Sequence, residues 1–194
     1  MSAGSTDEQD RSDMAQLAAG HDAALNELMD RHAERLFHYL LRLLQNETEA
    51  SDLAQETFVR VYQHRTRYKS EHKFSTWLYT IATNLACDLQ RHRARHPQAS
   101  LEGEQREKDF REVLPDAGPD PGATLEAAER ADAVRRAVAE LPEDLRLPLV
   151  LCEYEDKSHA EIGAILNCSA KAVEMRLYRA RQQLRTRLEK VLQG

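Results

Sequence analysis

The residues most suited to chemistry lie near the C-terminal end of the chain, where basic side chains gather on one predicted helix. Between residues 169 and 194 they outnumber Glu174 and Glu189 and give a local charge of +5, whereas the whole chain carries −6. These basic residues are Lys171, Arg176, Arg179, Arg181, Arg185, Arg187 and Lys190. Positive charge concentrated in this way favours binding to phosphate groups.

The segment before the basic helix predicts a helix-turn-helix. Ser158 and Glu161 have the spacing of a capping box at a helix start. Asn167 can end that helix in the left-handed conformation, and Ser169 can cap the next one. Gly163 lets the two helices cross closely. A lone basic helix is usually a solvated amphipathic face, but the capped partner helix and the short turn favour double-stranded DNA as the ligand.

The second helix of this motif has one apolar face and one polar side. Its apolar residues recur every three or four positions, as expected for a buried helix face: Val173, Leu177, Ala180, Leu184 and Leu188. We expect DNA contacts from residues at the start of this helix and off that face, namely Ser169, Lys171, Glu174, Arg176, Arg179 and Arg181.

A second polar stripe lies in a helix predicted to begin at Ser75, a good N-cap, and to end before Pro97. Its polar residues stand at i, i+4, i+7 and i+11: Asn84, Asp88, Arg91 and Arg95. Asparagine can hydrogen-bond base edges, and arginine can hold phosphate or guanine. This helix is therefore a second candidate for contact with nucleic acid.

Catalysis and metal binding find little support. His92 and His96 have the i, i+4 spacing of metal ligands, but no third ligand is apparent nearby and the surrounding basic run repels cations. The sequence has no phosphate-cradling glycine loop and no nucleophile motif. We therefore expect no metal, no cofactor and no enzymatic activity.

The apolar residues of the segments that carry these candidates recur with helical periodicity throughout, and we find no convincing strand with alternating apolar and polar residues. The fold class is predicted as all-α, with two small helical domains over residues 13–96 and 124–194. A disordered polar arm is expected over residues 1–12, and a flexible, acidic, turn-rich linker over residues 97–123. Pro148 should kink its helix or shift the helix start.

Cysteine use and hydropathy predict a location in the cytoplasm. The three cysteines, Cys87, Cys152 and Cys168, are few and odd in number, which favours thiols in a reducing compartment. No apolar run approaches membrane-spanning length, and the first residues lack the basic and apolar pattern of a signal peptide.

Three segments together resemble the extracytoplasmic-function group of bacterial RNA polymerase sigma factors. Residues 50–62 (ASDLAQETFVRVY) resemble the σ2 helix that docks on core polymerase. Residues 74–95 resemble the segment that melts DNA and reads the minus-ten element. Residues 141–184 resemble σ4, which reads the minus-thirty-five element. The resemblance implies a factor that binds core polymerase and directs promoter-specific initiation.

The resemblance also implies roles for individual residues. Asp52, Gln55 and Glu56 become the expected core polymerase contact, although the residues alone fit a solvated acidic face equally well. The loop over residues 68–73 is expected to capture a base flipped out of the minus-ten strand. Trp77 fits either strand opening or, more readily, a buried core position. The expected minus-ten residues are His72, Lys73, Trp77, Asn84, Asp88, Arg91 and Arg95.

The chain departs from the family at the start of its recognition helix. Residues 171–174 read Lys-Ala-Val-Glu in place of the usual Gly-Thr-Val-Lys/Arg. Glu174 weakens phosphate binding and can accept a hydrogen bond from a cytosine amino group. This departure puts the recognised promoter sequence in doubt, but it leaves the expected docking mode on DNA unchanged.

The implied partners are core RNA polymerase, promoter double-stranded DNA, the melted minus-ten strand and an anti-sigma factor, often one tethered to the membrane. The acidic linker is expected to thread basic channels of the polymerase. The alternative is a helix-turn-helix regulator that acts without core polymerase; it would need a sensing domain where this chain has helices ending in a basic run.

Overall fold

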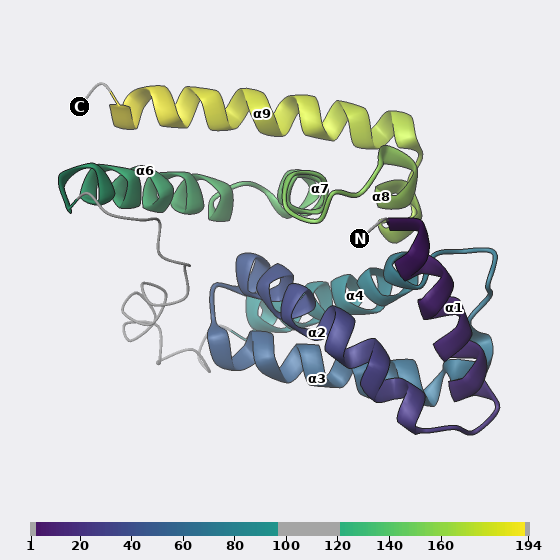
Figure 1. The fold of residues 1–194 in the computed structure, drawn as a ribbon. Helices are drawn as coiled ribbons and strands as arrows, with labels where there is room; N and C mark the ends of the chain where they lie inside the picture. The colour runs from purple at the N-terminus through teal and green to yellow at the C-terminus, as the bar shows by residue number, and fades with distance from the viewer. Residues whose placement is uncertain (1–2, 97–120, 193–194) are drawn as a thin grey trace.

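The computed structural model describes residues 3–96 and 121–192, and every regular element in those ranges is helical (Figure 1). The all-α prediction is confirmed for this part of the chain. Residues 97–120, which hold most of the expected acidic linker, lie outside the described residues. No helix in the described ranges is long and apolar enough to cross a membrane.

The first half of the chain forms a bundle of four helices, here called the N-terminal bundle. Its elements are α1 (Ala3–Ala18), α2 (Ala23–Leu44), α3 (Glu47–Gln63), a short 3-10 turn η1 (Arg65–Arg67) and α4 (Phe74–Arg95). Helix α2 lies against α1, α3 and α4 (Figure 1). Leu28, Leu36 and Leu40 of α2 are fully buried in this bundle.

The prediction of a disordered arm is wrong for residues 3–12, because these residues belong to α1. Asp10 is almost fully buried, and its carboxylate accepts a hydrogen bond from Arg31 Nε at 3.0 Å and lies 2.9 Å from His32 Nε2. Met14 and Leu17 are buried one and two turns further on. A polar segment thus forms a docked helix, since a buried carboxylate that is paired with an arginine and contacts a histidine no longer opposes folding.

Helix α4 starts one residue earlier than expected. It begins at Phe74, and its N-cap residue, Lys73, makes no side-chain capping hydrogen bond. Ser75 is therefore not the cap; its Oγ accepts a hydrogen bond from Lys157 Nζ at 2.9 Å instead. The buried ring of Phe74 accounts for this start, because it anchors the first turn to the core.

The second half forms the C-terminal unit. Its helices are α6 (Pro121–Ala139), α7 (Glu143–Glu153), α8 (His159–Ile165) and α9 (Ala170–Leu192). Helices α6 and α9 run side by side, with α7 and α8 between α9 and the bundle (Figure 1). Helix α6 starts three residues before the expected 124, with Pro121 in the first turn, where proline is tolerated. Helix α7 continues through Pro148, which is buried.

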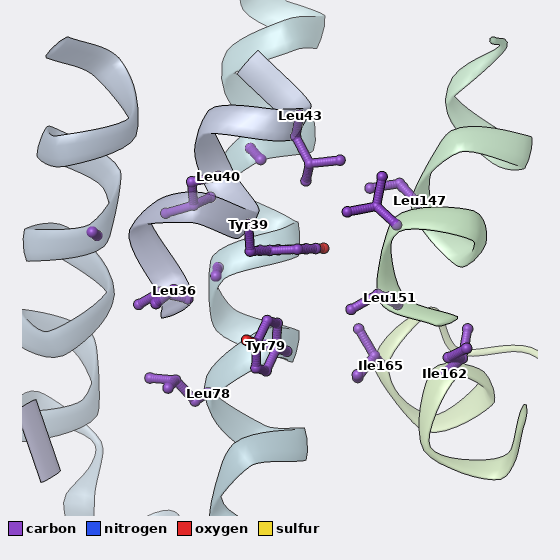
Figure 2. Packing of buried hydrophobic residues seen from close by; sticks show 14 of the residues in the cluster. Leu36, Tyr39, Leu40, Leu43, Leu78, Tyr79, Leu147, Leu151, Ile162 and Ile165 are labelled. Carbon is purple, nitrogen blue, oxygen red and sulfur yellow. The ribbon is translucent and has the colours of Figure 1, made fainter. Parts of the chain in front are cut away.

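The two halves share one apolar core. Helices α2 and α4 of the N-terminal bundle contact α7 and α8 of the C-terminal unit. Figure 2 shows Leu43 near Leu147, and Tyr39 extending toward the side where Leu147 and Leu151 lie. The sequence predicted two domains and gave no indication that they pack against each other.

Candidate nucleic-acid and polymerase interfaces

The helix-turn-helix has the local geometry that its sequence predicts. The Glu161 amide donates to Ser158 Oγ at 3.3 Å, and the Ser158 amide donates to the Glu161 carboxylate at 2.9 Å, which confirms the capping box. Asn167 is left-handed, with φ of 50°. The Ala172 amide donates to Ser169 Oγ at 3.1 Å, so Ser169 caps α9.

Gly163 fixes how closely α8 approaches the turn. A Cβ at this position would lie 2.6 Å from the carbonyl oxygen of Cys168. The Cys168 amide donates to the Gly163 carbonyl at 2.8 Å, so backbone packs directly on backbone here. The absence of a side chain at Gly163 is therefore a structural requirement of the turn.

One face of α9 is free to meet DNA, and we call it the recognition strip: Lys171, Glu174, Met175, Tyr178 and Arg179, all exposed. The opposite face is buried through Val173, Leu177 and Ala180. Met175 is 45% exposed and Tyr178 60% exposed, which is unusual for large apolar side chains. Neither was a predicted site residue, although both lie off the apolar face and could have been found by the same spacing.

Charge on the recognition strip is partly neutralised. Lys171 Nζ lies 2.8 Å from Glu174 Oε2, and this hydrogen bond lowers the pKa of Glu174. Among the described side chains, Arg179 has no ion-pair partner, so it is the cation of the strip most available to a phosphate or a base.

Two predicted DNA contacts lie outside the strip. Arg176 is partly buried, with Nη1 3.7 Å from Cys168 Sγ. Arg181 Nη2 lies 2.7 Å from Glu153 Oε1, which ties α9 to α7. The structure thus brings Ser169, Lys171, Glu174 and Arg179 together at the start and exposed face of α9, and separates Arg176 and Arg181 from them.

The predicted stripe on α4 is present: Asn84, Asp88, Arg91 and Arg95 are all exposed along one side of the helix. Arg91 Nη2 lies 2.7 Å from Asp88 Oδ1, and Arg95 Nε donates to the Arg91 carbonyl at 3.2 Å. Exposed pairs of this kind contribute little to stability, so these groups can exchange partners readily.

A cavity of about 820 Å³ lies between α4 and the C-terminal unit. Asn84 and Arg91 line it from α4, while Glu143 and Asp144 line it from α7. Arg176 of α9 also lines it. The polar stripe of α4 therefore faces the second domain over part of its length.

The loop before α4 surrounds an aromatic cluster. The ring of Trp77 is 5.4 Å from that of Tyr68 and 6.3 Å from that of Phe74, centroid to centroid, and Trp77 is partly buried. The packing agrees better with a core position than with a fully exposed wedge. His72 is exposed, and its carbonyl accepts a hydrogen bond from the Tyr68 hydroxyl at 2.8 Å.

The expected polymerase contact lies on the outer side of α3. Asp52 and Gln55 are exposed, and Glu56 pairs with Arg60 at 2.9 Å. Val59, one turn further on, is 46% exposed and adds an apolar side chain to this surface. We call the surface formed by Asp52, Gln55, Glu56 and Val59 the α3 face. The sequence prediction missed Val59, because an isolated valine in an amphipathic helix is normally counted with the core.

The rings of the two histidines with metal-ligand spacing lie close together, with their planes tilted by 40°. The ring centroids of His92 and His96 are 4.7 Å apart. Within the described ranges, no group of three or more histidine, cysteine or acidic side chains is placed to hold a metal ion.

A capped helix-turn-helix and a helical bundle with a second polar stripe define the class of this protein as a two-part, all-helical DNA-binding transcription factor. The family model for Sigma-70 region 2 matches residues 28–96, and that for Sigma-70, region 4 matches residues 131–184. The chain belongs to the extracytoplasmic-function (ECF) sigma factors of the sigma-70 family. It is therefore a factor that directs promoter-specific transcription initiation.

Similar proteins agree with this assignment. The ECF RNA polymerase sigma factor SigE of Mycolicibacterium smegmatis is 36% identical over 176 residues, which cover 89% of this chain and 66% of SigE. SigW of Bacillus subtilis is 32% identical over 177 residues, covering 89% of this chain and 93% of SigW. The structure of CnrH in complex with the cytosolic domain of CnrY superposes with a TM-score of 0.69 at 27% identity, covering 94% of this chain and 98% of CnrH.

Proposed function

We propose that the C-terminal unit, residues 121–194, reads the minus-thirty-five element as σ4, with the recognition strip of α9 in the major groove. The observation that carries this proposal is the exposed strip itself, held at a fixed angle by a capped partner helix and by Gly163. Ser169 at the helix start and Arg179 supply contacts to phosphate or base edges. Met175 and Tyr178 offer apolar contact to thymine methyl groups.

We further propose that the N-terminal bundle, residues 3–96, acts as σ2. The α3 face would bind core polymerase through Asp52, Gln55, Glu56 and Val59. The loop over residues 68–73 would hold a flipped base, and the α4 stripe would contact the minus-ten strand. Support comes from the exposure of all four stripe residues, Asn84, Asp88, Arg91 and Arg95, and from the basic end of α4.

The polymerase supplies the chemistry in this proposal, and the chain contributes no catalysis. Its place of action is the cytoplasm. CnrH was solved with the cytosolic domain of CnrY; by analogy, we propose that an anti-sigma protein holds this factor until a signal releases it. The acidic linker is proposed to enter basic channels of the polymerase.

One experiment separates this function from that of an independent helix-turn-helix regulator. Purified chain and core polymerase should initiate RNA synthesis from a defined subset of genomic promoters, mapped by the 5′ ends of the transcripts. Tight binding to particular DNA sites by the chain alone, with no initiation when core polymerase is added, would favour the regulator.

We expect Val59→Asp to weaken binding to core polymerase by roughly 10-fold or more, because a carboxylate buried at an interface without a partner is strongly penalised. Thermal stability should hardly change, since Val59 is 46% exposed. Fluorescence anisotropy of labelled chain, titrated with core polymerase, measures the affinity. Asn26→Asp, which adds the same charge at an exposed position on α2, is the control. Equal weakening of polymerase binding by both variants would contradict the proposal that the α3 face binds core polymerase.

A further inference from the structure

The N-terminal helix α1 carries a buried carboxylate that is held by α2. Asp10 is 1% exposed, and its two oxygens have different partners. Arg31 Nε donates to one oxygen at 3.0 Å, and His32 Nε2 lies 2.9 Å from the other. A buried ion pair adds little stability over apolar packing, but its directional hydrogen bonds hold the side chains in one arrangement. Asp10 therefore determines where the His32 ring lies.

The His32 ring connects α1 to the start of α4. Its centroid lies 5.2 Å from that of the Phe74 ring, with the two planes tilted by 58°. Phe74 is 1% exposed and follows directly after the loop over residues 68–73. The Phe74 ring in turn lies 6.2 Å from the Tyr68 ring and 6.3 Å from the Trp77 ring, centroid to centroid. A continuous series of contacts thus runs from α1 to both ends of this loop.

Three charged side chains of α1 also lie close to the loop itself. Asp7 Oδ2 lies 3.5 Å from Nζ of Lys73, the last residue of the loop. Burial raises the pKa of the Tyr68 hydroxyl, and Arg11 lowers it. Asp10 and Asp7 raise it further, so all three α1 residues act on the first side chain of the loop. Helix α1 also contacts η1 and α4, the elements on either side of the loop.

We propose that α1 positions the loop over residues 68–73 for base capture, with Asp10 as a positioning residue that acts through His32 and Phe74. The proposal rests on the function proposed above for this loop. A loop that already has its bound conformation loses less conformational entropy when it takes up a flipped base. Loosening the contact with α1 makes the loop more mobile, so capture of the base weakens while contacts to the DNA backbone persist.

Trp77 can report on this arrangement in the chain alone. It is the single tryptophan of the sequence, and its ring centroid lies 5.4 Å from that of Tyr68. Asp10→Asn removes the charge that holds His32. We expect acrylamide to quench Trp77 fluorescence about 2-fold more efficiently in this variant, because the aromatic cluster opens to solvent more often.

The matched control is Asp13→Asn, which removes the same charge from the same helix. Asp13 pairs with Arg31, as Asp10 does, but among the described residues it has no contact with His32. Loss of the Asp13 charge weakens the attachment of α1 to α2 without releasing the His32 ring. Quenching of Trp77 should therefore stay near the wild-type value in this variant.

Binding of the melted strand measures base capture directly. Holoenzyme is titrated with labelled single-stranded minus-ten DNA of a mapped promoter, either intact or with an abasic site at each position in turn. In the wild type, the position of the captured base gives the largest loss of affinity. Asp10→Asn should weaken binding of the intact strand roughly 5-fold. Binding of the strand that lacks the captured base should hardly change, because the loop has no base to hold there.

A second variant keeps the test decisive if Asp10→Asn folds poorly. In His32→Gln the side-chain amide can still donate to Asp10, so α1 stays docked, while the ring against Phe74 is lost. We expect the same increase in Trp77 quenching and the same smaller penalty for the abasic site. Thermal melting followed by circular dichroism verifies that each variant is folded.

Three results would overturn the proposal. The first is unchanged Trp77 quenching in both Asp10→Asn and His32→Gln, and the second is an equal effect of Asp13→Asn. The third is equal weakening of intact and abasic strands, which would mean a general loss of DNA binding. A wild type without any abasic penalty would instead contradict the function proposed for the loop. The quenching assay contains neither DNA nor polymerase, so it decides separately whether α1 positions the loop.

Discussion

Gly163→Ala should destabilise the C-terminal unit and sharply reduce binding to the minus-thirty-five element. The added Cβ would lie 2.6 Å from the Cys168 carbonyl oxygen, a distance that real contacts do not reach. The clash is with backbone, and the hydrogen bond from the Cys168 amide to the Gly163 carbonyl holds that backbone in place. Overpacking of this kind costs about 1–3 kcal/mol, more than the gain of about 1 kcal/mol from alanine's helix propensity.

Chemical denaturation followed by circular dichroism measures the loss, and footprinting of holoenzyme on a mapped promoter measures the effect on DNA. Ala160→Val is the control, because Ala160 lies on the same short helix at an exposed position. We expect it to cost only the small difference in helix propensity. If Gly163→Ala were as stable as the wild type, the turn would have to tolerate a wider helix crossing than the structure has.

The turn around Gly163 could be predicted from sequence because its determinants are local. A serine cap, a glycine at a close approach and a left-handed asparagine each act within a few residues of their partners. Ser158, Asn167 and Ser169 accordingly have the conformations or hydrogen bonds that their spacing predicts.

Tertiary partners explain where the sequence-based predictions failed. The first residues look disordered because they are polar, and only the pairing of Asp10 with Arg31 and His32, more than 20 positions away, makes them a docked helix. Glu155 is one acid in an acidic turn until the fold brings it to Arg35 and Tyr79. No periodicity carries information about such distant contacts.

The same limit applies to the recognition helix. The 3.6-residue period correctly separated its buried face from its polar side. It could not tell which polar residues meet α7 and which face outward, because that depends on how the helices pack. Arg181 is therefore held by Glu153, while Arg179, two positions earlier, is exposed without an ion-pair partner among the described residues.

This difference gives a matched pair of variants. Arg179→Ala should lower holoenzyme affinity for a mapped promoter by roughly 10-fold, because it removes an unpaired cation from the strip that faces the groove. Arg181→Ala removes a cation of the same type that is already paired with Glu153. An exposed pair contributes only about 0–1 kcal/mol to stability, so we expect DNA affinity to stay within about 2-fold of the wild type.

Salt dependence separates the two contacts that Arg179 can make. If Arg179 binds a phosphate, Arg179→Ala should reduce the slope of log affinity against log salt by about 1, with little change in sequence preference. If it binds a guanine, the loss should be concentrated at one base pair of the minus-thirty-five element. A larger loss from Arg181→Ala than from Arg179→Ala would mean that α9 enters the groove by its other flank, which requires the Glu153 pair to break on binding.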